Sequence, residues 1–208
     1  YDSIPTTVIN SFLSAEDKNF FKHPGIDPKG IVRALLNNFK NIVNNKRLEG
    51  ASTITQQVAK NFLLTNDISL KRKIKEAILA FRIEKAYSKK KILELYLNQI
   101  YLGEGTYGIA AASLEYFDKS VRELNYPEAA LLAALPKAPS KYNPFRYYEV
   151  AKLRRNLVLQ NLNENSFIND NDFKKFKKKE INLKKRKIKL LKEANYYTEE
   201  IRRIIKDN

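Results

Sequence analysis

The chain has 208 residues, of which 43% are hydrophobic and 11% aromatic. A chain of this length and apolar content can bury the core of a domain, which excludes a wholly disordered protein. It has no cysteine and a single histidine, so disulfide frameworks, thiol nucleophiles and the usual zinc sites are excluded as well. Any chemistry must therefore come from carboxylates, hydroxyls, amides and cations.

The formal net charge of +16 is unevenly distributed along the chain. Residues 174–206 contain 14 Lys and Arg against 4 Asp and Glu, so +10 of the net charge lies there. Such charge favours a polyanionic partner: nucleic acid, anionic lipid headgroups or a phosphorylated substrate. Because the chain has no methionine, we expect it to be a fragment of a longer protein. No window approaches the roughly 20 apolar residues of a membrane span.

Helices are predicted in the first quarter of the chain. Apolar residues at helical spacing predict one over residues 7 to about 21, and its apolar stripe runs into Glu16. Asp27 precedes a proline, as an N-cap residue often does, and the apolar pattern that follows predicts a helix over about 28–43. Residues 44–51 are polar and contain a glycine, so we predict an exposed, mobile loop.

The rest of the chain continues the helical pattern. Thr53 with Gln56 has the form of a capping box, and Ser69 and Ser88 are placed as N-caps. Three glycines between 103 and 108 interrupt regular structure. The predicted helices cover about 53–63, 69–87, 88–100, 109–116, 127–135 and 149–163, with helical pieces beyond 169. No segment shows the alternation of a strand, so the predicted class is all-α.

Glu16 is a candidate general acid or base. It follows Phe12 by four residues, which places its carboxylate on the apolar face of the first helix. Desolvation on such a face raises a carboxyl pKa toward the range in which proton transfer is efficient. The alternative, equally compatible with the pattern, is a glutamate at a helix end that reaches solvent past the edge of the core.

Several charged residues form a second group of candidates. Arg72 and Glu76 have the i, i+4 spacing of an ion pair, and the face they share with Glu84 also carries apolar residues, unlike a fully solvated one. Lys60, Arg72 and Lys73 flank one short connection, where cations and helix N-termini can hold a diphosphate. Ordinary surface lysines explain this pattern too. We interpret His23 as a hydrogen-bonded turn residue, and the tyrosines at 96, 101, 107 and 116 as core or rim aromatics.

Five ordered segments together resemble the peptidoglycan glycosyltransferase domain of class A penicillin-binding proteins. They are residues 16–27 (EDKNFFKHPGID), 50–61 (GASTITQQVAKN), 72–84 (RKIKEAILAFRIE), 92–108 (ILELYLNQIYLGEGTYG) and 128–144 (EAALLAALPKAPSKYNP). The resemblance implies an all-α, lysozyme-like fold with a flexible, membrane-facing lobe. It assigns residues 1–168 to the glycosyltransferase domain and 169–208 to a basic helical linker.

The resemblance also implies roles for particular residues. Glu16 matches the general base that deprotonates the 4-hydroxyl of the acceptor GlcNAc, and Glu76 matches a second glutamate near the donor diphosphate. The reaction is inverting: donor MurNAc is joined through a β-1,4 bond and undecaprenyl diphosphate leaves. Residues that match diphosphate-binding or other donor-site positions are Arg33, Ser52, Gln57, Lys60, Arg72 and Asn143. No cofactor or resident metal is expected to be required, although a role for Mg²⁺ or Mn²⁺ is left open.

The implied partners are lipid II as donor and acceptor, the growing glycan strand and the bacterial membrane surface, with no nucleic acid. The expected location is the outer face of the cytoplasmic membrane, held by an N-terminal anchor that this chain lacks. Residues 194–203 resemble the segment by which bifunctional members leave this domain, so we expect a C-terminal transpeptidase domain in the parent protein.

Three alternatives compete with this reading. A lysozyme-like hydrolase would use Glu16 as an acid, but it has no need of a diphosphate site. A nucleic-acid-binding protein would explain the basic tail and predicts steep salt dependence, yet it leaves the five segments unexplained. A catalytically inert scaffold is disfavoured because both glutamates are present.

Overall fold

The computed structural model describes residues 1, 3–43, 50–62 and 69–184. Its helices are α1 (Thr6–Glu16), α2 (Pro28–Val43), α3 (Ile54–Phe62), α4 (Leu70–Ala86), α5 (Lys89–Gln99), α6 (Ile109–Phe117), α7 (Tyr126–Ala134), α8 (Tyr148–Glu164) and α9 (Asp170–Lys178). Short 3₁₀ turns cover Phe20–Lys22 and Val121–Glu123. Within the described ranges the extended pairing is limited to an isolated bridge between Tyr101 and Tyr107. The predicted all-α class is confirmed.

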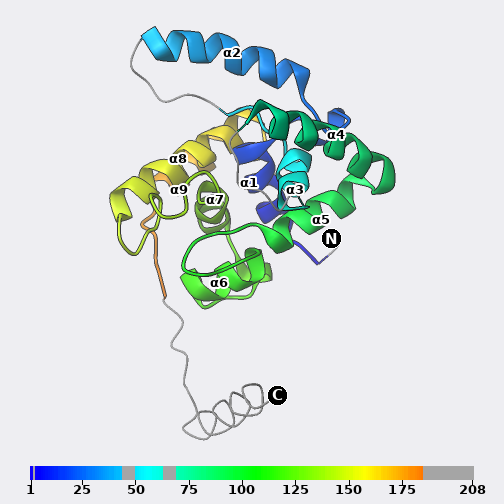
Figure 1. The fold of residues 1–208 in the computed structure, drawn as a ribbon. Helices are drawn as coiled ribbons and strands as arrows, with labels where there is room; N and C mark the ends of the chain where they lie inside the picture. Colours follow the sequence, from blue (N-terminus) through cyan, green and yellow to red (C-terminus); the bar gives the residue numbers. More distant parts are fainter. Residues whose placement is uncertain (2, 44–49, 63–68, 185–208) are drawn as a thin grey trace, which may run out of the picture.

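Helix α7 forms the centre of the core. Every residue from Ala129 to Leu135 is buried, because this segment consists of alanines and leucines. Helices α1 and α8 pack against it, and α6 lies beside it (Figure 1). Asn125 and Glu128 form a reciprocal capping box at its start, so the helix begins slightly before the predicted Pro127. The apolar stripe of α1 is thereby held against the molecule's most deeply buried element.

Helices α3, α4 and α5 form a second packed group, which meets α1 through the edge-to-face contact of Phe12 with Tyr96. Their predicted caps are confirmed. The Thr53 hydroxyl accepts from the Gln56 N–H at 3.1 Å while the Gln56 side chain accepts from the Thr53 N–H at 3.0 Å. Ser69 and Ser88 each accept a backbone N–H three residues on, at the starts of α4 and α5. Local sequence signals thus set where these three helices begin.

Helix α1 ends at Glu16, five residues before the predicted end. Asp17 leaves the helical conformation with φ −159° and ψ 77°. Its carboxylate contacts the His23 Nε2 at 2.9 Å and accepts the Ile54 N–H at 3.0 Å. A side chain that binds two distant segments cannot follow the helix, so these tertiary bonds end α1 and confirm His23 as a hydrogen-bonded turn residue.

Helix α2 lies along one edge of the molecule, away from the α7 core (Figure 1). The apolar pattern that predicts it is largely exposed: Val32, Leu35, Leu36 and Phe39 are 56–73% accessible. Helix α4 also exposes apolar side chains, among them Leu70 and Ile74. None of the described helices combines the length and the apolar character needed to cross a bilayer. Most of the predicted loop at 44–51, and Leu63, lie outside the described residues.

Residues beyond α8 pack onto the domain. Phe173 and Phe176 of α9 contact the core, and the fully buried Arg155 donates to the carbonyl oxygens of Lys177 and Lys179 at 3.3 and 2.7 Å. The described part of the basic segment is therefore docked on the helical core. The predicted boundary after residue 168 stays a prediction, and the segment 194–203 lies outside the described residues.

Candidate functional site

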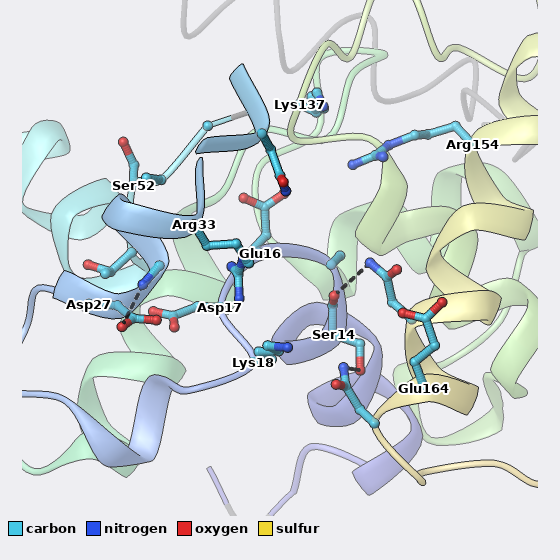
Figure 2. Close-up of a pocket in the computed structure, with 18 residues that line it drawn as sticks. Ser14, Glu16, Asp17, Lys18, Asp27, Arg33, Ser52, Lys137, Arg154 and Glu164 are labelled. Atoms are coloured by element: carbon cyan, nitrogen blue, oxygen red, sulfur yellow. Dashed lines mark hydrogen bonds between the residues drawn. The ribbon is translucent and has the colours of Figure 1, made fainter. Parts of the chain in front are cut away.

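A cavity of about 450 Å³ opens where α1 ends. Its walls are the C-terminal end of α1, the first turns of α2, the segment 50–53 and one face of α8 (Figure 2). Glu16 lies at its middle, with Ser52 and Arg33 to one side and Glu164 to the other. The lining is mostly polar and contains both signs of charge, which suits a large polar substrate.

The Glu16 carboxylate is half-buried in this cavity. Its Oε2 accepts from the Gln57 Nε2 at 2.7 Å, and the Gln57 Oε1 lies 3.5 Å from the Tyr96 hydroxyl. Burial raises the pKa of Glu16 above its ordinary value of 4.5, while the Gln57 hydrogen bond and the positive charges of Arg154 and Lys137 act in the opposite direction. A carboxylate with a raised pKa and an open face can accept a proton from a substrate hydroxyl.

Asp17 secures the elements around Glu16. Besides binding His23 and the first N–H of α3, it lies directly next to Glu16 in the chain. The Thr53 hydroxyl donates to the Gly25 carbonyl at 2.5 Å, which ties the start of α3 to the loop after α1. These bonds fix where α3 begins, and so they fix the position of Gln57 relative to Glu16.

A chain of charged contacts runs from the cavity wall into α4. The Lys73 Nζ donates to the Ser52 Oγ at 2.9 Å and to the Glu76 Oε2 at 2.5 Å, and the Arg72 Nη1 lies 2.9 Å from the Glu76 Oε1. The predicted Arg72–Glu76 ion pair is thus present, and Glu76 is only 1% exposed. Glu76 orients two cations, of which Lys73 is about half exposed beside the cavity.

The structure brings most of the predicted site residues together. Arg33 and Ser52 line the cavity with Glu16, Gln57 binds Glu16, and Glu76 and Arg72 join the group through Lys73. Lys60 is exposed on α3, three residues after Gln57, and does not line the cavity.

Asn143 is the predicted site residue that the structure places elsewhere. Its Nδ2 donates to the Glu104 Oε1 at 2.5 Å, and its Oδ1 accepts from the Phe145 N–H. These contacts join the glycine turn to the segment before α8, and the predicted donor-site role of Asn143 stays a prediction.

Sequence reasoning assigned no role to several residues of the cavity. Lys137, in the segment after α7, and Arg154 of α8 line the cavity and lower the pKa of Glu16. Lys137 stands inside the last of the segments that carry the family resemblance. Arg154 lies in a helix with many charged residues, so the sequence does not distinguish it from them. Only the fold shows that it faces the cavity.

No preformed metal centre is evident among the residues that the structure describes, because no three His, Asp or Glu side chains gather there as ligands. Glu76, the carboxylate expected near the diphosphate, is already paired with two side-chain cations. The residues present therefore supply positive charge themselves, and the open question of Mg²⁺ or Mn²⁺ stays untested.

The domain is all-α, and a half-buried carboxylate with a raised pKa lies in its cavity, next to the ion pairs of the buried Glu76. A family model described as transglycosylase matches residues 1–163. The chain is 52% identical over 201 residues to penicillin-binding protein 1A of Rickettsia felis, covering 97% of this chain and 25% of that protein. It is 54% identical over 184 residues to penicillin-binding protein 1A of Aquifex aeolicus, covering 88% and 25%.

A comparison of folds also finds a penicillin-binding protein. A 2.6 Å crystal structure of penicillin-binding protein 1A from Haemophilus influenzae matches with a TM-score of 0.53 and 26% identity, covering 97% of this chain and 20% of that one. The chain therefore belongs to the transglycosylase family, which confirms the resemblance seen in its sequence. It spans about a quarter of the length of the curated relatives it matches.

Proposed function

We propose that this domain is a peptidoglycan glycosyltransferase that polymerises lipid II into β-1,4 glycan strands with inversion. The observation that carries the proposal is Glu16: a half-buried carboxylate with a raised pKa, held by Gln57 in a polar cavity whose walls carry cations. Family membership supports glycosyl transfer, and the geometry supplies a base for it.

In the proposed reaction Glu16 takes the proton of the acceptor 4-hydroxyl. The oxygen of that hydroxyl forms a bond to the anomeric carbon of the donor sugar, and the bond from that carbon to the diphosphate oxygen breaks. Its electron pair leaves on undecaprenyl diphosphate. Because this leaving group is anionic, cations fixed before the reaction stabilise the charge that develops on it.

We assign this role to Arg33, which lines the cavity, and to Lys73, which contacts Ser52 at the cavity wall, with Arg72 behind it. Glu76 holds Lys73 and Arg72 on one side of Ser52, so they need little reorganisation when charge appears. We assign Lys60 a weaker, long-range contribution because it is exposed outside the cavity. Glu76 is then a positioning residue for these cations.

The exposed apolar side chains of α2 and α4 support an association with the membrane surface, where a lipid-linked substrate resides. We propose that the domain works at the outer face of the cytoplasmic membrane. A parent protein with a C-terminal transpeptidase domain fits relatives about four times the length of this chain.

The test is incubation of the domain with labelled lipid II in detergent, with and without Mg²⁺, followed by separation of the glycan products. Wild type is expected to form polymer with or without Mg²⁺, and Glu16→Gln is expected to lose about 10²- to 10⁴-fold in rate. Glu149→Gln, an exposed glutamate on α8 outside the cavity, is the matched control. Cleavage of preformed strands without polymer formation would establish a hydrolase instead.

A further inference from the structure

We infer that the α8 side of the cavity is a carbohydrate subsite that takes the acceptor saccharide, with Asn161, Asn165 and Glu164 as its recognition residues. All three line the cavity with Glu16. None of them belongs to the segments that carry the family resemblance. The assignment to the acceptor rests on the proposed function, whereas the sugar-binding chemistry stands on the residues themselves.

Asn161 and Glu164 belong to the last turn of α8, and Asn165 is its C-cap. Arg154, Asn161 and Asn165 are spaced by seven and four residues, which places them on the same face of a helix. This face borders the cavity, while the neighbouring stripe that includes Val158 and Leu162 is buried against the core. The amphipathic character of α8 therefore directs a row of polar side chains into the cavity.

Hydrogen bonds within the protein hold these side chains in place. The Asn161 Nδ2 donates to the Ser14 carbonyl at 3.0 Å, and the Asn165 Nδ2 donates to the Ser14 Oγ at 3.2 Å. The Gln160 Nε2 donates to the Glu164 Oε1 at 2.8 Å. Each bond uses only part of its group's capacity, since a primary amide has two N–H donors and an acceptor oxygen, and a carboxylate has two oxygens.

The donors and acceptors that these three side chains leave unused suit the binding of a sugar. Fixed amides and a carboxylate can pair with vicinal hydroxyls and with an acetamido group, each of which offers both donors and acceptors. Because Ser14 already restricts the two asparagine side chains, they lose little conformational entropy when a ligand binds. The fixed ion-pair network of Arg72, Lys73 and Glu76 lies on the Ser52 side instead.

The order of groups along the cavity assigns this subsite to the acceptor. Figure 2 shows Ser52 and Arg33 on one side of Glu16, and Ser14 and Glu164 on the other. An inverting displacement brings the nucleophile to the face of the anomeric carbon opposite the leaving group. If the diphosphate lies toward Ser52 and Lys73, the acceptor hydroxyl approaches from the α8 side, past Glu16.

The probe is a lipid-free tetrasaccharide of alternating GlcNAc and MurNAc, titrated into the domain and followed by NMR. The double variant Glu164→Gln, Asn165→Ala is expected to weaken its binding at least tenfold, while Glu149→Gln, outside the cavity, leaves it within twofold. The double variant keeps the Asn161 bond to the Ser14 carbonyl but loses the Asn165 bond to the Ser14 Oγ, so its thermal unfolding is measured to confirm that the domain is folded at the temperature of the titration. Failure of the wild type to bind the sugar, or an unchanged affinity of the double variant, overturns the inference.

A kinetic readout separates this inference from the proposed function. With lipid II as donor, the double variant should raise the KM for the acceptor at least tenfold and leave kcat within threefold. A fall in kcat without a change in acceptor KM would instead mean that this edge of α8 only supports the end of α1. If wild type forms no polymer, the proposed function fails, yet the titration still decides whether sugar binds beside α8.

Discussion

The Gln57 side chain donates a 2.7 Å hydrogen bond to Glu16, across 41 positions of sequence. This bond stabilises the ionised carboxylate that burial disfavours. Two segments of the chain that separately resemble family motifs are thus joined at one carboxylate. Its pKa reflects burial, which raises it, against this amide and the charges of Arg154 and Lys137, which lower it.

Gln57→Ala is expected to raise the pKa of Glu16 further, because the donor that lowers it is gone. As a general base must be ionised, the acid limb of kcat against pH should move to higher pH, measured as the rate of glycan formation between pH 5 and 9. The exposed amide of Gln99 on α5 offers the control Gln99→Ala. An unshifted acid limb in Gln57→Ala would show that this bond does not tune the base.

Glu16→Gln is expected to increase stability at neutral and alkaline pH. The folded pKa of Glu16 is raised above 4.5, so its stabilising contribution is full below the unfolded pKa and is lost as pH rises through the folded pKa. Replacing the Glu16 carboxylate with the neutral amide of glutamine removes this loss of stability at high pH. Thermal unfolding of both proteins at pH 4 and pH 8 should show a difference at pH 8 that vanishes at pH 4, and an equal difference at both would contradict it.

Glu76→Ala should destabilise the domain strongly. The carboxylate is 1% exposed and paired with Arg72, itself only 14% exposed, so its removal leaves a largely buried cation unpaired. Breaking such a pair costs about 3–5 kcal/mol, measurable as a lower urea midpoint. The comparison variant is Glu94→Ala, whose pair with Lys91 is more exposed and should contribute little. Equal midpoints for the two variants would show that burial of Glu76 does not matter.

The glycine turn offers a matched pair of substitutions. Gly108 has φ +79° and its missing Cβ would lie 2.5 Å from the Asn98 carbonyl oxygen, whereas Gly105 has φ +70° and open space around it. Gly105→Ala should cost about 1–2 kcal/mol from its backbone conformation alone. Gly108→Ala adds a backbone clash and should cost clearly more by urea unfolding. Similar losses would mean that the turn relaxes around the new methyl group.

The sequence by itself determined the helices, because their signals are local. Thr53 with Gln56, Ser69 and Ser88 satisfy N–H groups within one helical turn, and the alanines and leucines of α7 can only be buried. The family segments likewise identified Glu16, Gln57, Arg72 and Glu76 as a set.

The tertiary structure alone decided how these residues meet. Asp17 ends α1 by binding segments that lie farther along the chain, and no local pattern encodes that. Arg154 and Asn161 become cavity residues only because α8 packs beside the end of α1, and Asn143 is drawn to Glu104 instead. Helix signals act over a few residues, whereas the environment of a charge depends on everything that folding brings around it.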